Sequence, residues 1–319
     1  MKLSVLLPVM PLDVRAAMPF AAMVKHSPGH SLWQGQGLLL DSYQLFTALS
    51  AAGVGVPMGS GVALIPLRSP LEAAVQINSV MALSKQPMVA GFGPGAKSFQ
   101  ASVMQRPYSS PLTAMREYLG IVRELLTGRP VSRDGQYFSL HAQLPPLHTN
   151  IAELGLGVLR PRMAALAGEV ADVAITWMCP PSYISTILQP ALQAAAESAG
   201  RPSPRIVSVV PVAREVPGRE HAKLLWEGSQ VHLGAPHYQD MLARAGIDVT
   251  TGTPSESTGR LLAGEVFLGG SLDRIGEGLQ SYKAAGVDEL VLNTTGVASV
   301  SADAALEELA TILTEVSPG

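Results

Sequence analysis

Short apolar segments alternate with helical segments along this chain of 319 residues, and the alternation limits its fold more than any other feature. Strands that are each followed by a helix imply a parallel sheet with right-handed connections. Eight such units close into a (β/α)8 barrel, the TIM-barrel form of the α/β class, and an open doubly wound sheet is the alternative. No Gly-x-Gly-x-x-Gly follows the first strand, which weakens the dinucleotide-binding form of the open sheet. We therefore predict a barrel with core strands near residues 5, 32, 60, 89, 155, 174, 209 and 290.

The signals for individual elements are clearest between residues 56 and 95, where the pattern indicates strand, helix and strand. Pro70 is placed to open the helix, because the N–H that proline lacks is not needed in a first turn. Asp13, Asp41 and Ser271 each precede a helical pattern, so each is predicted to be an N-cap.

Two additions to the repeating unit are predicted. After the fourth strand, an amphipathic pattern at 113–126 and an Asp134-Gly135 turn indicate an inserted helix and a β-hairpin. Residues 247–259 are rich in Thr, Gly, Ser and Pro, which favours a mobile loop before the last helix. No segment has the composition of a linker, so we expect one domain over residues 1–319.

Composition excludes several classes of function. The chain is 47% hydrophobic and 15% charged with a formal net charge of −3, which favours a large core and argues against nucleic-acid binding. No apolar window is long enough for a membrane span, and Pro8 interrupts the only stretch that resembles a signal peptide. The single cysteine, Cys179, rules out an intramolecular disulfide, so we expect a cytoplasmic protein. No spacing of His, Cys and Asp suggests a metal site.

Five blocks of sequence together resemble the bacterial luciferase-like superfamily of flavin- and deazaflavin-dependent oxidoreductases, which have TIM-barrel folds. The fourth block is most similar to the branch that uses coenzyme F420, an 8-hydroxy-5-deazaflavin. The blocks are PMGSGVALIPLRSPLEAAVQINSV, GFGPG, MREYLGIVRELLTGRPVSRDGQYF, RPRMAALAGEVADVAITWM and FLGGSLDRIGEGLQSYKAAGVDELVL.

The resemblance implies a cofactor site at the barrel mouth, the end at which the carboxyl ends of the strands meet. It places a non-proline cis peptide at Gly61-Val62, behind the central ring of the cofactor. Glycines allow close approach of a ligand to backbone, so Gly91, Gly93 and Gly95 are expected to line the same site, although a plain tight turn is the alternative.

Other side chains complete the expected site. Trp33 and Trp177 follow strands and are expected to face the mouth and stack on the ring, with core packing as the alternative. Gln34 lies where several relatives have polar contacts. The start of a helix forms an anion site, so the residues there are predicted to bind the cofactor phosphate, unless they form an ordinary solvated helix end: Leu159, Arg160, Arg162 and Met163.

Three residues at a break in a long helical stretch are candidate proton donors: His232, His237 and Tyr238. The resemblance implies hydride transfer from reduced F420 to an electrophilic C=C or C=N bond of a small-molecule or peptide substrate, such as a dehydroamino acid. An FMN-dependent monooxygenase of the same fold is the first alternative. A non-catalytic cofactor-binding paralogue is the second, because Arg160 and Val173 stand where relatives often carry glycine. Relatives are often dimers, so we expect a homodimer.

Overall fold

Eight parallel strands close into a barrel in the computed structural model, which describes residues 1–146 and 152–316. The ring closes because β1 pairs with β2 on one side and with β12 on the other. The predicted (β/α)8 barrel is therefore confirmed and the open doubly wound sheet is excluded. In order around the ring, the strands are β1 (Lys2–Leu6), β2 (Leu32–Gln34), β3 (Met58–Ser60), β5 (Met88–Gly93), β8 (Glu153–Gly157), β9 (Val173–Trp177), β10 (Arg205–Arg214) and β12 (Glu289–Asn293).

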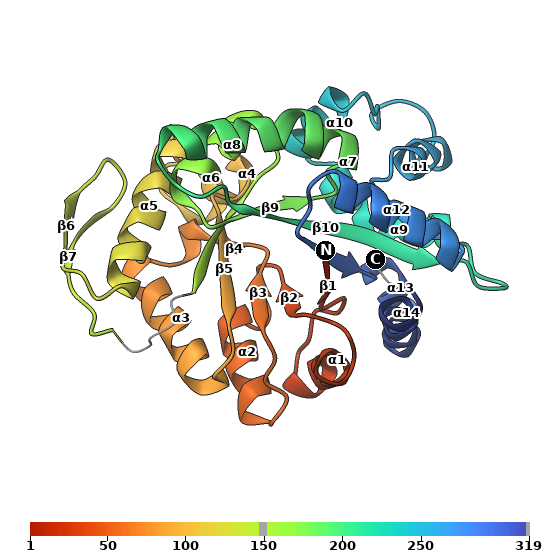
Figure 1. The fold of residues 1–319 in the computed structure, drawn as a ribbon, viewed down its shortest axis with the longest axis horizontal. Coiled ribbons are helices and arrows are strands. Elements are labelled where there is room, and N and C mark those ends of the chain that lie inside the picture. Colours follow the sequence, from red (N-terminus) through yellow and green to blue (C-terminus); the bar gives the residue numbers. More distant parts are fainter. Residues whose placement is uncertain (147–151, 317–319) are drawn as a thin grey trace.

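Helices surround the strands (Figure 1). The side chains of Asp13, Asp41 and Ser271 accept hydrogen bonds from the first turns of their helices, so these predicted N-caps are confirmed. None of the described helices is long and apolar enough to cross a bilayer. The larger helices are α1 (Val14–His26), α2 (Ser42–Ala51), α3 (Pro70–Ser84), α5 (Pro111–Leu126), α6 (Pro161–Val170), α8 (Gln189–Ser198), α9 (His221–Leu233), α10 (Pro236–Arg244), α11 (Pro254–Ala263), α12 (Leu272–Ala284) and α14 (Ala302–Glu315).

Shorter elements join these. The β10 strand carries β11 along its outer end, and β4 pairs with β5. The shorter elements are β4 (Ala63–Leu64), a 3-10 turn at Ile65–Leu67, α4 (Lys97–Val103), α7 (Pro181–Tyr183), a π-helical segment at Ile184–Leu188, β11 (Leu268–Gly270) and α13 (Thr295–Ala298).

The predicted hairpin is present as β6 (Val131–Asp134) and β7 (Ser139–Ala142), and it projects from the body of the fold beside α5 (Figure 1). The turn lies slightly later than expected, because Asp134 ends β6 and residues 135–138 lie between the strands. The carboxylate of Glu117 on α5 holds this turn by accepting hydrogen bonds from the backbone N–H groups of Gln136, Tyr137 and Phe138, at 2.8–3.2 Å.

The predicted loop at 247–259 is wrong over its second half. Helix α11 begins at Pro254, and Thr253 and Glu256 form a reciprocal capping box at its start. The Thr, Ser and Pro content that indicated a loop is in fact a helix start signal. Arg260 further ties the remaining residues to the helix by donating to the carbonyl of Asp248, at 2.7 Å.

The interior of the barrel is packed around the indole of Trp33, which is fully buried. Gly59 on β3 makes room for it, since a Cβ atom at Gly59 would lie 2.3 Å from Trp33 Cδ2. Ile175 on β9 fills the space beside Gly91 and Gly155, where added Cβ atoms would lie 2.3 and 2.6 Å from its Cδ1. The bare backbones of these strands are therefore covered by large side chains from other strands.

A buried carboxylate lies at the floor of the barrel, below Trp33. Glu289 is 1% exposed, and its Oε1 accepts hydrogen bonds from Ser4 at 2.6 Å and from Ser31 and Trp33 Nε1 at 2.8 Å. Burial acts to raise the pKa of Glu289, but these hydrogen bonds and the nearby Arg205 outweigh it and hold the pKa below its usual value. The carboxylate thus anchors the indole from below.

Replacing Gly91 by alanine tests this packing, because the new Cβ would lie 2.1 Å from the backbone oxygen of Ser60, which cannot move aside freely. We expect Gly91→Ala to lower the free energy of unfolding by about 1–3 kcal/mol. Gly120 in α5 is the matched control, since a Cβ there meets nothing within 4 Å, and Gly120→Ala should stabilise by up to about 1 kcal/mol. Urea unfolding followed by circular dichroism measures both, and equal effects would contradict the packing.

Candidate functional site

Ligands of parallel α/β barrels bind at the carboxyl ends of the strands. At this mouth, Val62 and Trp177 are partly exposed and both pack on the apolar side chains that fill the barrel, among them Leu6, Val89 and Ile175. The Gly61-Val62 peptide bond is cis, as predicted. These two residues give the mouth an apolar wall.

The two glycines of β5 that are expected to line the site do not expose their backbone at the mouth. Gly91 and Gly93 are buried, and a Cβ at Gly93 would lie 2.7 Å from Val62 Cγ2. These glycines accommodate Val62 and Ile175 rather than an open surface. Gly95 has φ +73°, so it serves the tight turn, where Gln100 donates to its carbonyl at 3.0 Å.

The expectation that Trp33 faces the mouth is also wrong. Its side chain is 0% exposed, and it points to Glu289 inside the barrel. The alternative of core packing holds for Trp33, because a bulky ring fits where the neighbouring strand carries glycine. Its neighbour Gln34 is 7% exposed, and the Gln34 Oε1 atom has no hydrogen-bond partner among the described residues.

Sequence reasoning missed a second buried polar atom of this kind. Thr294 follows β12 and is fully buried, and its Oγ1 has no partner within residues 1–146 and 152–316. Leaving a buried polar atom without a partner costs about 1–3 kcal/mol. Gln34 ends β2 and Thr294 directly follows β12, the two strands that flank β1, so both buried unpartnered atoms lie on the same side of the barrel.

The structure brings Trp177 together with all three candidate proton donors. His232, at the end of α9, stacks on the indole with ring centroids 5.1 Å apart and planes 20° apart. Tyr238 of α10 meets His232 edge-on at 5.3 Å, and His237 lies 4.8 Å from Tyr238. Just after Trp177, Met178 has φ +53°, a left-handed conformation that few non-glycine residues adopt.

Burial sets the protonation of this cluster. It lowers the pKa of His232, with a further contribution from His237, and it lowers the pKa of His237 together with the charge of Arg160. Burial also raises the pKa of Tyr238 far above its usual range. At neutral pH all three are therefore uncharged hydrogen-bond donors, and their role in proton transfer stays a prediction.

The segment predicted to bind phosphate differs from expectation. Arg160 makes no capping hydrogen bond to α6, and its Nε lies 2.9 Å from Asp240 Oδ2. Asp240 also pairs with Arg244, at 3.1 Å. Arg160 is therefore already engaged by a carboxylate that comes from α10, 80 residues further along the chain.

The backbone of this segment also has fewer free donors than expected. Pro161 has no N–H, and the N–H of Met163 donates to Arg160 O at 3.0 Å. The carbonyl of Leu159 accepts from the Tyr183 hydroxyl at 3.2 Å, while Arg162 is exposed in the first turn of α6.

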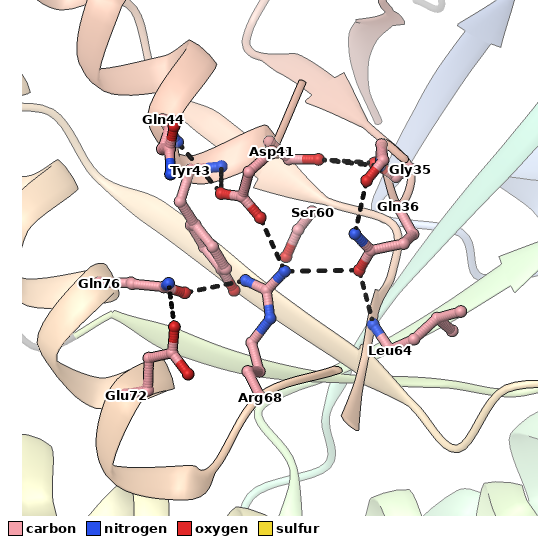
Figure 2. A network of polar contacts seen from close by, with 12 residues as sticks. Gly35, Gln36, Asp41, Tyr43, Gln44, Ser60, Leu64, Arg68, Glu72 and Gln76 are labelled. Carbon is pink, nitrogen blue, oxygen red and sulfur yellow. Dashed lines mark hydrogen bonds and ion pairs between the residues drawn. The ribbon is translucent and has the colours of Figure 1, made fainter. Parts of the chain in front are cut away.

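A second missed feature is a polar network behind the mouth, centred on Arg68 (Figure 2). Its guanidinium lies 2.9 Å from Asp41 Oδ2 and 3.0 Å from Gln76 Oε1. The network also includes Gln36, whose Oε1 lies 3.5 Å from Arg68 Nη2. The only part of this network that the sequence predicts is the N-cap at Asp41. The cap is confirmed, and the same carboxylate also pairs with Arg68.

Two clefts lie apart from the apolar wall, one at the amino-terminal ends of the strands and one beyond the carboxyl end of β10. One of about 490 Å³, lined by Arg123, Asp172 and Arg201, is at the opposite, amino-terminal ends of β8 and β9. Another of about 1050 Å³ lies between Trp226 on α9 and the start of α11. Neither includes Val62, Trp177 or Gln34, and we place the candidate site at the mouth because the apolar wall and the unpartnered polar atoms lie there.

The sequence profile of luciferase-like monooxygenases matches residues 24–289. The chain belongs to the luciferase-like monooxygenase family. A 5,10-methylenetetrahydromethanopterin reductase from Methanolobus tindarius is 30% identical over 175 residues, which are 54% of this chain and 52% of the relative. The chain thus matches only about half the length of this family relative.

Solved structures match almost the full length of the chain. A coenzyme F420-dependent tetrahydromethanopterin reductase from Methanopyrus kandleri has a TM-score of 0.77 at 17% identity, covering 98% of this chain and 99% of that one. The oxygenating constituent of 3,6-diketocamphane monooxygenase from Pseudomonas putida, solved with FMN, has a TM-score of 0.75 at 16% identity, covering 100% and 98%. At such identities the likeness shows the fold alone.

The partly buried side chain of His232 predicts how stability depends on pH. Its pKa is lowered in the folded protein, so the unfolded chain binds the proton first as the pH falls through about 6.5. Stability that is present above this pH is therefore lost below it. Between pH 7.5 and 5.5, we expect His232→Gln to lose less unfolding free energy than the wild type, by up to about 1.4 kcal/mol per pH unit.

Urea unfolding at a series of pH values measures this effect. The control is His26→Gln, the same exchange at an exposed position on α1. The same pH dependence in His232→Gln and the wild type would contradict the burial of a neutral His232.

Proposed function

We propose that the protein is a reductase that uses reduced coenzyme F420 to deliver hydride to an electrophilic C=C or C=N bond of a small-molecule or peptide substrate, such as a dehydroamino acid. The observation that carries the proposal is the apolar wall of Val62 and Trp177 beside the buried, unpartnered amide oxygen of Gln34. A flat ring with polar edge atoms fits such a surface. Membership of the family and the fold shared with an F420-dependent reductase support the choice of cofactor.

Each group at the mouth has a part in this proposal. Val62 and Trp177 present apolar faces that exclude water, and Gln34 accepts a hydrogen bond from the edge of the ring. His232, His237 and Tyr238 hold N–H and O–H donors beside Trp177 for the proton that accompanies hydride. Reduced F420, when bound, supplies the hydride chemistry itself.

One of the residues proposed to bind the cofactor phosphate already has an ion-pair partner. Arg160 and Arg162 supply positive charge at the start of α6, but Arg160 must give up or share Asp240 to meet an anion. We retain these arginines as the proposed phosphate ligands.

Two other functions have a specific observation in their favour. An FMN-dependent monooxygenase is supported by the likeness of the fold to the Pseudomonas putida enzyme solved with FMN. A non-catalytic cofactor-binding paralogue is supported by the ion pair that already engages Arg160. The barrel itself does not separate the three.

Titration of the purified protein with F420 and with FMN, followed by tryptophan fluorescence and melting temperature, separates them. We expect F420 to quench the fluorescence with a micromolar Kd, and FMN to bind at least about tenfold more weakly. Nanomolar FMN binding with oxygen consumption would favour the monooxygenase. Tight F420 binding without turnover of any electrophilic alkene or imine would favour the paralogue, and binding of neither cofactor would reject the proposed site.

Replacing a single tryptophan by alanine tests where the deazaflavin ring binds. Loss of an aromatic stacking surface weakens binding by about 1–3 kcal/mol, so Trp177→Ala should bind F420 at least about fivefold more weakly. The matched control is Trp226→Ala, because Trp226 lies in the separate cleft beside α11. Equal Kd values for Trp177→Ala and the wild type, or a larger loss in Trp226→Ala, would place the ring elsewhere.

A further inference from the structure

The loop at residues 35–41, which follows β2 at the mouth, is weakly held by apolar packing. Leu38 and Leu39 are 66% and 59% exposed. Exposed leucines contribute little to stability, because the hydrophobic effect depends on the area removed from water. Only Leu40 of the three loop leucines packs against the core, so polar contacts supply much of what holds this loop beside the candidate site.

These contacts form a chain centred on Arg68 (Figure 2). Arg68 Nη2 donates to Asp41 Oδ2 at 2.9 Å and to Gln36 Oε1 at 3.5 Å, so it grips the loop at two points. Gln36 Oε1 also accepts from the backbone N–H of Leu64, at 3.1 Å. The loop after β2 is thereby tied to the segment after β3.

Helices α2 and α3 hold the guanidinium from the other side. Arg68 Nη1 donates to Gln76 of α3 at 3.0 Å, and the guanidinium carbon lies 4.8 Å from the centre of the Tyr43 ring on α2. Asp41 makes two contacts in this network, because its Oδ1 caps α2 while its Oδ2 pairs with Arg68. A planar guanidinium that donates from two nitrogens to three side chains suits arginine and not lysine.

The segment that this network fixes is the one that carries the apolar wall. It runs from Gly61 and Val62 to Arg68, and the N–H of Gly61 donates to the carbonyl of Gln34 at 2.9 Å. The Arg68 side chain is 5% exposed, so its charge is removed from water and depends on these partners. Loss of the guanidinium would release both mouth segments together.

We propose that Arg68 is a positioning residue of the ligand site, which holds residues 35–41 and 61–68 together so that Val62 and Gln34 form a preformed surface. Preformed sites bind more tightly because less ordering remains to be done on binding. The role in ligand binding rests on the proposed function, whereas the fixing of the two segments does not.

The test compares Arg68→Met and Arg68→Lys with Arg123→Met. Arg123 pairs with Asp172 at 2.9 Å at the opposite end of the barrel, so its loss removes an ion pair without touching the mouth. Hydrogen–deuterium exchange of the ligand-free proteins and F420 titration are measured for each. Asp41→Asn is added because asparagine keeps the N-cap while the ion pair is removed, should Arg68→Met fail to fold.

We expect Arg68→Met to exchange faster at residues 35–41 and 61–68 and to bind F420 at least tenfold more weakly. Arg68→Lys and Asp41→Asn should show the same changes to a smaller extent, and Arg123→Met should keep the wild-type Kd. Wild-type exchange at both segments in Arg68→Met and Asp41→Asn would overturn the proposal, as would an equal loss of affinity in Arg123→Met. If the wild type binds neither F420 nor FMN, the proposed function fails and the exchange data alone decide the positioning role.

Discussion

The Trp33 indole packs directly against the backbone of Gly59, and the residues at the mouth of the barrel lie on top of this ring. Glu289 anchors the indole from below through Nε1, and a Cβ at Gly61 would lie 3.3 Å from its upper edge. The segment that carries Val62 therefore packs on a ring whose position is fixed from below by Glu289. A change at the floor would be transmitted to the wall of the candidate site through this stack.

Features that depend on neighbours in sequence could be predicted from the chain alone. The caps at Asp13 and Asp41, the helix opened by Pro70 and the alternation that gives the barrel all rest on contacts within a few residues. The part of the candidate site that was missed rests on long-range pairs. The partner of Arg160 comes from α10, and Arg68 lies 27 residues from Asp41.

Two errors share one physical cause. Tryptophan at a strand end and glycine in the next strands were interpreted as a ligand surface, but they are complementary parts of the interior, because a large ring needs neighbours without side chains. Of Trp33 and Trp177, only Trp177 lies in the mouth, at the end of β9 on the opposite side of the ring. The mouth therefore combines the apolar side chains of Val62 and Trp177 with buried polar atoms at Gln34 and Thr294.

The account is tested most directly by a crystal structure of the protein grown with F420. It predicts the deazaflavin ring between Val62 and Trp177, with a polar edge atom within hydrogen-bond distance of Gln34 Oε1. A ring bound instead in the cleft beside Trp226 or in that beside Arg123 would contradict it.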